Sequence, residues 1–113
     1  MLKNISKNKI IAKNYVKCYD WVSKFFGLMF KKNITPLVFI FNTERIVSLH
    51  SFFVKFPIDV VFLNELFEVV ELKQNMLPYQ FYTPKNKALF VLELPEHSIV
   101  NGDIALNDIV SFK

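Results

Sequence analysis

Glycine, cysteine and long uninterrupted apolar runs are scarce in this 113-residue chain. The single cysteine, Cys18, excludes a disulfide within the chain. With only Gly27 and Gly102, turns that need positive φ must often be formed by asparagine. No apolar stretch has the length of a membrane span, and no signal-peptide pattern follows the basic start of the chain. These absences predict a cytoplasmic protein that does not enter a membrane.

The sequence also lacks the short motifs that mark common catalytic and cofactor sites. It contains no paired histidines or cysteines at metal-ligand spacing, so a metal site would have to be assembled from distant residues. It has no phosphate-binding loop, no dinucleotide fingerprint and no hydrolase nucleophile motif. We therefore expect no metal and no cofactor.

The composition is that of a folded globular domain. Hydrophobic residues make up 52% of the chain and charged residues 21%, which is far from a disordered composition. The length fits one domain over residues 1–113, with residues 1–8 as a loose lead-in. Thirteen phenylalanines predict an aromatic-rich core or an aromatic surface. An exposed strand edge with such a surface would allow a homodimer as well as a monomer.

Apolar patterning predicts a mainly β domain, sandwich- or barrel-like, with one short α-helix near the N-terminus. The helix is expected over residues 20–33, where apolar residues recur at helical spacing after a capping Asp20. A hairpin-like turn is expected over residues 42–45, and an irregular crossing over residues 73–87. The predicted strands cover residues 9–17, 37–41, 46–53, 58–63, 67–72, 88–94 and 109–112.

The densest apolar run, residues 49–64, organises the rest of the chain. Pro57 has no N–H donor and is expected to split this run into two strands. Asp59 then lies inside the second strand, between Ile58 and Val60. Because a buried carboxylate without partners is costly, Asp59 is the first candidate for a functional or a structural polar contact.

Several segments together resemble a known family. They are Gly27-Leu28-Met29, His50-Ser51-Phe52-Phe53, Phe56-Pro57-Ile58-Asp59-Val60-Val61-Phe62-Leu63 and Val91-Leu92-Glu93-Leu94-Pro95. In this order they resemble uncharacterised protein family 0127, also called domain of unknown function 192, over roughly residues 15–113. The resemblance implies a small archaeal or bacterial domain with a mostly β, sandwich-like fold and no established activity.

The chain departs from this family at three positions that the family tends to fill with glycine. Phe67, His97 and Asn107 stand there. Asparagine tolerates the left-handed conformation, so the turn at Asn107 is expected to survive. Phe67 and His97 can adopt that conformation only at a cost, so those two turns are expected to be reshaped.

Two acids inside apolar strands, Asp59 and Glu93, suggest two different roles. If they converge, they form a general acid–base pair that, with His50, would serve a small hydrolase or isomerase. Alternatively, each accepts backbone hydrogen bonds or an ion pair and fixes a strand end. His50 itself fits a proton shuttle or an ordinary hydrogen-bonded residue at a strand end.

The preferred hypothesis is a non-enzymatic domain that binds a small molecule or a protein through a pocket near Asp59. The aromatic segment around Tyr79 is expected to cover an open end of the β core, where a pocket would lie. The residues predicted to contribute to binding are His50, Phe53, Pro57, Asp59, Tyr79, Phe81, Tyr82 and Glu93.

The charge distribution supports a third, less favoured hypothesis. Residues 1–33 hold eight lysines and a single acid, an asymmetry that is found in proteins that contact nucleic acids. The simpler interpretation is that these lysines form the solvated face of an edge strand, where lysine discourages unwanted pairing.

Overall fold

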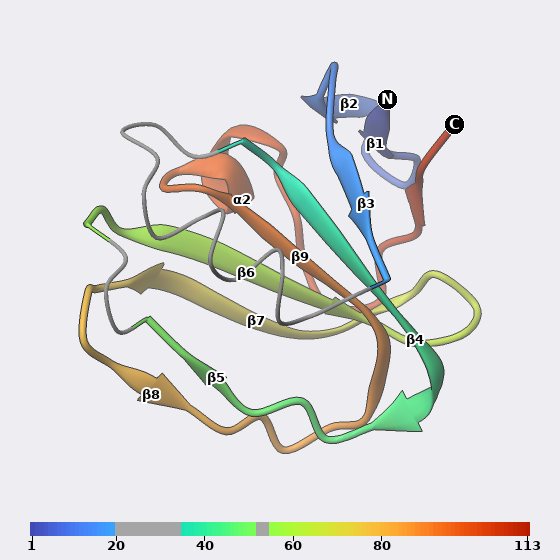
Figure 1. The fold of residues 1–113 in the computed structure, drawn as a ribbon. Coiled ribbons are helices and arrows are strands. Elements are labelled where there is room, and N and C mark those ends of the chain that lie inside the picture. Colours follow the sequence, from blue (N-terminus) through green and yellow to red (C-terminus); the bar gives the residue numbers. More distant parts are fainter. Residues whose placement is uncertain (20–34, 52–54) are drawn as a thin grey trace.

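The computed structural model describes residues 1–19, 35–51 and 55–113. They form a mainly β, compact fold (Figure 1). Its radius of gyration is 12.7 Å, close to the roughly 13 Å expected for a compact chain of this length. The described residues form ten strands: β1 (Leu2–Asn4), β2 (Lys9–Ala12), β3 (Val16–Cys18), β4 (Leu37–Arg45), β5 (Leu49–His50), β6 (Ile58–Leu63), β7 (Val69–Met76), β8 (Phe81–Tyr82), β9 (Ala88–Pro95) and β10 (Val110–Ser111).

A five-stranded sheet in the order β3-β4-β9-β6-β7 forms the centre of the described fold. Its middle strands, β6 and β9, pair antiparallel over their whole shared length, from Ile58 opposite Pro95 to Leu63 opposite Phe90. All six residues of β6 are buried, as expected for a strand that is covered on both faces. This strand has the bounds that the sequence predicted.

Two smaller sheets cover opposite faces of the central sheet (Figure 1). On one face, the three-stranded sheet β10-β1-β2 and the short helix α2 (Ser98–Asn101) pack against buried residues such as Val61 and Leu92. We call this the helix face. On the other face, Leu49 and Tyr82 of the β5–β8 pair pack against residues such as Val60 and Phe62. We call this the hairpin face.

The start of the chain differs from the expected loose lead-in. Leu2–Asn4 forms the central strand of the small sheet, between β10 and β2. The side chains of Leu2 and Asn4 are fully buried. Burial of Leu2 in the core of the helix face orders this segment, because each buried aliphatic side chain contributes about 2 kcal/mol.

Three other predictions of secondary structure are wrong, only partly met or outside the described residues. The turn predicted at residues 42–45 is wrong, because β4 continues to Arg45, which lies opposite Ala88 after an irregular stretch. The strand predicted over residues 46–53 is reduced, in the described part, to Leu49–His50. The helix predicted over residues 20–33 lies outside the described residues. The helix that the structure does describe, α2, was not predicted.

Three left-handed residues stand where the related family tends to have glycine. Phe67, His97 and Asn107 have φ values of 64°, 73° and 73°. The turns at Phe67 and His97 therefore keep the glycine-like backbone, although we expected them to be reshaped. Asparagine adopts this conformation at little cost, whereas histidine and especially phenylalanine do so under strain.

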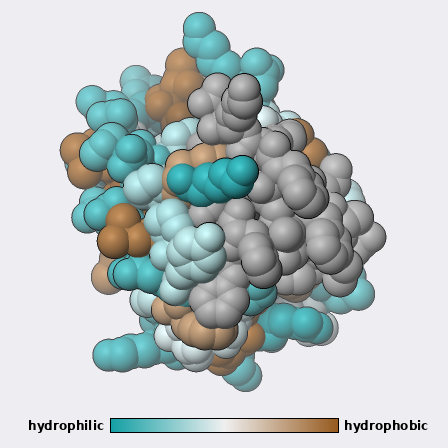
Figure 2. Space-filling view, turned by 60° about the vertical axis from the view of Figure 1, so that its left-hand side comes forward, coloured by the Kyte–Doolittle hydropathy of each residue, from teal (hydrophilic) through white to brown (hydrophobic). Residues whose placement is uncertain are grey.

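No helix in the described parts of the chain is both long enough and apolar enough to cross a membrane. The face in Figure 2 shows hydrophobic side chains in separate areas among hydrophilic ones, apart from the atoms drawn in grey. Single exposed apolar residues of this kind are normal on a folded protein.

Candidate functional site

Asp59, the first predicted site residue, is 2% exposed on the helix face. Its two carboxylate oxygens accept hydrogen bonds from the backbone N–H groups of Asn75 (2.9 Å) and Ile99 (3.0 Å). Asp59 thus connects the end of β7 to the first turn of α2. Charge-assisted bonds to backbone N–H groups compensate for the burial of a carboxylate, so Asp59 has the environment of a structural residue.

A small cleft does lie beside Asp59, although its other residues differ from the predicted ones. Its volume is about 260 Å³. The lining residues are Asp59, Gln74, Asn75, Glu96, His97 and Val100. Of these, only Asp59 was predicted. The others are polar residues and one isolated apolar residue in turns and near strand ends, and the sequence alone gives no sign that such residues share a cleft.

Glu93 is 7% exposed on β9. Directly opposite it in the sheet lie Leu37 of β4 and Val60 of β6. Its carboxylate accepts no hydrogen bond from any of the described residues. Burial raises the pKa of Glu93 to about 7, because the charged form is poorly solvated among apolar neighbours.

Asp59 and Glu93 do not form the predicted acid–base pair. Glu93 is opposite Val60, whereas Asp59 is opposite Leu94. Directly opposite residues share a face, and successive residues alternate between faces. Asp59 therefore points to the helix face and Glu93 to the hairpin face. The sheet itself separates the two carboxylates, so they cannot act on one substrate atom.

Glu93 differs in this respect from the other buried acids of the described chain. Asp59 accepts two hydrogen bonds. Asp108 accepts bonds from Asn4, Lys7 and Ala105. Glu71 accepts bonds from Tyr82, Lys85 and Asn86. Among the described residues, the buried side-chain atom without a partner is Oδ1 of Asn4, and Glu93 differs from the other three acids in that its carboxylate accepts no hydrogen bond there.

His50, Tyr79 and Phe81 surround one end of the hairpin face. His50 is exposed and meets the ring of Phe81 edge-on at 6.2 Å. Tyr79 and Phe81 are strongly exposed, Phe81 at 72%. These predicted binding residues thus present aromatic surface. His50 lies on β5, which pairs with β8 and not with the strand of Glu93.

Ser51 fixes the loop that carries these aromatic residues. Its hydroxyl donates to the carbonyl of Leu77 (2.5 Å) and accepts from the N–H of Gln80 (2.9 Å). Its own backbone exchanges hydrogen bonds with Gln80 and Tyr79. The loop is therefore rigidly attached to β5. The role of Ser51 was not predicted from the sequence, since a serine next to an apolar run has no distinguishing pattern.

Tyr82 is a structural residue and not part of an open binding surface. Its ring packs near Phe62, at 6.0 Å between centroids. Its hydroxyl donates to Glu71, and Lys73 lies over its ring. Burial, followed by the bond to Glu71, raises the pKa of Tyr82 to about 12. Of the remaining predicted binding residues, Pro57 is half-buried just before β6, and Phe53 lies outside the described residues.

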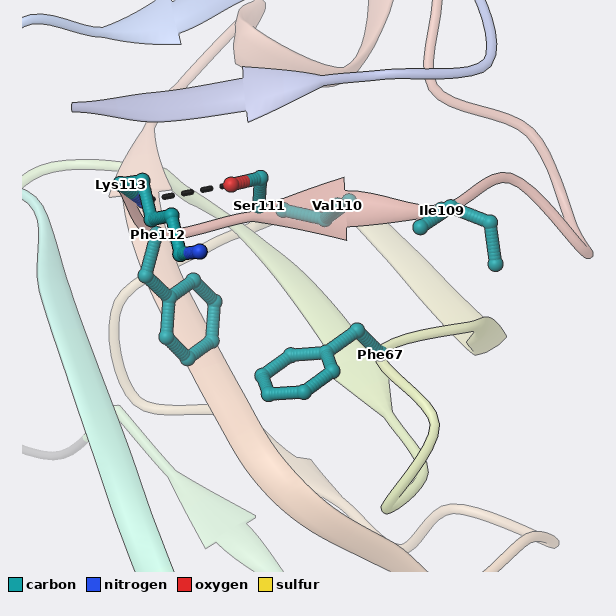
Figure 3. A pocket seen from close by; sticks show the side chains of 6 residues that line it. All are labelled: Phe67, Ile109, Val110, Ser111, Phe112 and Lys113. Carbon is teal, nitrogen blue, oxygen red and sulfur yellow. Dashed lines mark hydrogen bonds between the residues drawn. The ribbon is translucent and has the colours of Figure 1, made fainter.

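An apolar cleft that the sequence did not predict lies on the helix face, beside the turn at Phe67. Its volume is about 330 Å³. The lining residues are Phe67, Ile109, Val110, Ser111, Phe112 and Lys113 (Figure 3). The sequence feature that could have indicated this cleft is Phe67, a phenylalanine at a position that the family tends to fill with glycine.

Comparison with known proteins identifies the relatives of this chain. Residues 15–112 match the model of the domain of unknown function 192 family, described as uncharacterised. The chain belongs to this family, also called UPF0127. A UPF0127 protein of Pyrococcus furiosus is 34% identical over 107 residues, which cover 93% of this chain and 91% of that protein. A UPF0127 protein of Pyrococcus horikoshii is 38% identical over 98 residues, 84% of each chain. The predicted family and its archaeal members are thus confirmed.

A solved structure shares the fold of this UPF0127 protein. A protein of unknown function from Novosphingobium aromaticivorans superimposes with a TM-score of 0.76 over 85% of this chain and 72% of that protein. The two sequences are 20% identical, so the likeness concerns the fold alone. The function of the family is not established by any of these relatives.

Proposed function

We propose that this protein is a cytoplasmic, non-enzymatic binding domain, and that Glu93 contacts its ligand. One observation carries the proposal: Glu93 is the one buried acid of the described chain whose carboxylate accepts no hydrogen bond there, while Asp59, Glu71 and Asp108 each accept two or more. A ligand that hydrogen-bonds to Glu93 would give its carboxyl group the partner that it lacks among the described residues.

The surroundings of Glu93 suit a ligand with one polar group and an apolar body. Leu37 and Val60 flank the carboxyl group in the sheet, and Val91 belongs to the same buried cluster. Binding sites for small molecules typically combine such apolar walls with a few polar groups. With its pKa at about 7, the carboxyl group can donate a hydrogen bond when protonated or accept one when ionised near neutral pH.

A catalytic function has less support from this geometry. The hydrolase or isomerase hypothesis requires Asp59 and Glu93 on one side of the sheet, and they lie on opposite sides. A single carboxyl group without a second acid or base at the same point suffices for recognition, whereas general acid–base chemistry needs groups within hydrogen-bonding reach of one reacting atom. The hypothesis of a nucleic-acid contact stays a prediction. One of the lysines on which it depends, Lys7, forms an ion pair with Asp108 at 2.8 Å.

Native mass spectrometry of protein purified gently from a cell extract tests the proposal. We expect the wild type to carry an additional mass that is absent from Glu93→Gln, a variant that keeps the size of the side chain and removes the acid. Glu65→Gln, at an exposed turn position, is the matched control and should keep the mass. Far-UV circular dichroism of all three proteins should confirm that each is folded. An additional mass retained by folded Glu93→Gln would contradict the assignment of Glu93.

A further inference from the structure

The turn that carries Phe67 is fixed by a dense set of hydrogen bonds. The side-chain oxygen of Asn64 accepts from the N–H groups of Leu66 (2.9 Å) and Glu68 (3.0 Å). The N–H of Phe67 donates to the carbonyl of Asn64 (3.0 Å), and the carbonyl of Phe67 accepts from Val110 (3.0 Å). The left-handed conformation of Phe67, rare for a bulky residue, is therefore imposed by its surroundings.

This turn places the ring of Phe67 in an ordered aromatic group. It stacks on the ring of Phe90, with 4.9 Å between centroids and 16° between planes. The ring of Phe112 stands perpendicular to both, at 5.3 Å from Phe67 and 5.1 Å from Phe90. Tyr15 also holds this end of the chain, because its hydroxyl donates to the carbonyl of Phe112 (2.6 Å).

The aromatic group is only partly enclosed. Phe67 keeps 38% of its surface exposed, and its ring and that of Phe112 form walls of the cleft of about 330 Å³ (Figure 3). This volume lies at the lower end of the range for small-molecule sites, about 300–1,000 Å³. Phenyl walls in fixed positions favour a flat ring, which can stack on one and meet the other edge-on.

The lining of the cleft includes one charged side chain. Lys113 is the charged residue in its lining, and its backbone N–H is held by the hydroxyl of Ser111 (3.2 Å). An ammonium group at the edge of an apolar cleft attracts an anion and disfavours a cation. A carboxylate on the ligand would complement it.

We propose that the cleft lined by Phe67 and Phe112 binds a small planar aromatic carboxylate. The ring of the ligand packs against the two phenyl groups, and its carboxylate meets the ammonium of Lys113. This site lies on the helix face, whereas Glu93 points to the hairpin face, so it is independent of the proposed function. The strained backbone of Phe67 then serves to position its ring as a wall of the binding site, and strained residues often cluster at ligand sites.

Titration of the ¹⁵N-labelled protein with indole-3-acetate, followed by NMR, tests this site. We expect amide shifts that saturate and centre on Phe67, Ile109 and Ser111. Phe67→Gly removes one wall while suiting the left-handed backbone, and it should weaken binding about tenfold. Phe81→Ala removes an exposed ring from the other face and is the matched control, with unchanged affinity expected.

A neutral analogue tests the role of charge. Indole-3-acetamide should bind the wild type about threefold more weakly than indole-3-acetate, and Lys113→Gln should abolish this difference. If the amide shifts at the cleft do not saturate up to about 5 mM probe, any dissociation constant is too high for a useful affinity. That result would overturn the proposal. So would equal affinity of the wild type and folded Phe67→Gly. Equal affinity of the two probes would overturn the assignment of a carboxylate ligand.

Discussion

Asp59 and Glu93 occupy neighbouring positions on the paired strands β6 and β9, and their carboxylates lie on opposite faces of the central sheet. One is bonded to two backbone N–H groups, and the other has no partner among the described residues. This difference supports a role of Asp59 in holding the fold together and underlies the proposal that Glu93 contacts a ligand.

Asp59→Asn should destabilise the fold. The amide replaces one acceptor oxygen by a donor, which then faces the N–H of Asn75 or Ile99 and leaves a buried donor unpaired. A cost of about 2 kcal/mol in the free energy of unfolding is expected, measured by urea denaturation. Asp103→Asn, at an exposed position, is the control. Unchanged stability of Asp59→Asn would show that the two hydrogen bonds contribute nothing net.

Stability should depend on pH through Glu93. Its folded-state pKa of about 7 lies above the ordinary value of 4.5, so the folded protein binds this proton more tightly than the unfolded chain. The stabilising contribution is complete below pH 4.5 and is lost as the pH rises to about 7, a change of about 3 kcal/mol. Urea denaturation of wild type and Glu93→Gln at pH 5, 6, 7 and 8 measures it.

In that experiment, the difference in unfolding free energy between wild type and variant isolates the single group, since all other titrations are shared. The difference should shift against the wild type as the pH rises. A constant difference across this range would mean that Glu93 does not titrate between the ordinary carboxyl range and neutrality.

Asn4 should contribute more to stability than an exposed asparagine. Its amide nitrogen donates to the carbonyl of Gly102 (3.1 Å) and to the carboxylate of Asp108 (3.0 Å). Asn4→Ala leaves these buried acceptors without that donor and should lower the free energy of unfolding by about 2 kcal/mol. Asn14→Ala, in an exposed loop, should change it by less than about 0.5 kcal/mol. Similar effects of both substitutions would contradict the role of this network.

His97→Gly should stabilise the protein. His97 has a φ of 73° and an exposed side chain, so glycine relieves strain while losing little contact. A gain of about 0.5–1 kcal/mol is expected. Glu96→Gly, at the preceding position with ordinary φ, should instead destabilise, because glycine adds backbone entropy to the unfolded chain. Thermal unfolding of both variants decides the matter, and a loss of stability in His97→Gly would contradict the prediction.

The sequence predicted individual strands better than their arrangement. β6 was found with its exact bounds, because Pro57 and Asn64 delimit a run of strand-forming residues. The same run is apolar on both faces, so no alternation showed which way Asp59 points. That depends on the pairing of β6 with β9, whose partners lie 27 to 37 residues apart in the chain, and pairing register cannot be derived from local pattern.

Errors at residues 42–45 and 1–8 have a related cause. Asn42 and Thr43 have turn-like sequence, yet tertiary pairing near Ala88 keeps β4 extended. Leu2–Asn4 is too short for a periodic signal, and its strand forms because two distant segments flank it. Local propensity is a weak guide where long-range contacts determine the conformation.

The position of β1 between β2 and β10 also has a consequence for biosynthesis. Leu2–Asn4 is made early, but its partner Val110–Ser111 is made more than 100 residues later. On the ribosome, the small sheet therefore cannot close until nearly all of the described chain has emerged. Closing so long a loop is slow, and until then the apolar residues that this sheet covers on the helix face would remain accessible to chaperones or to other nascent chains.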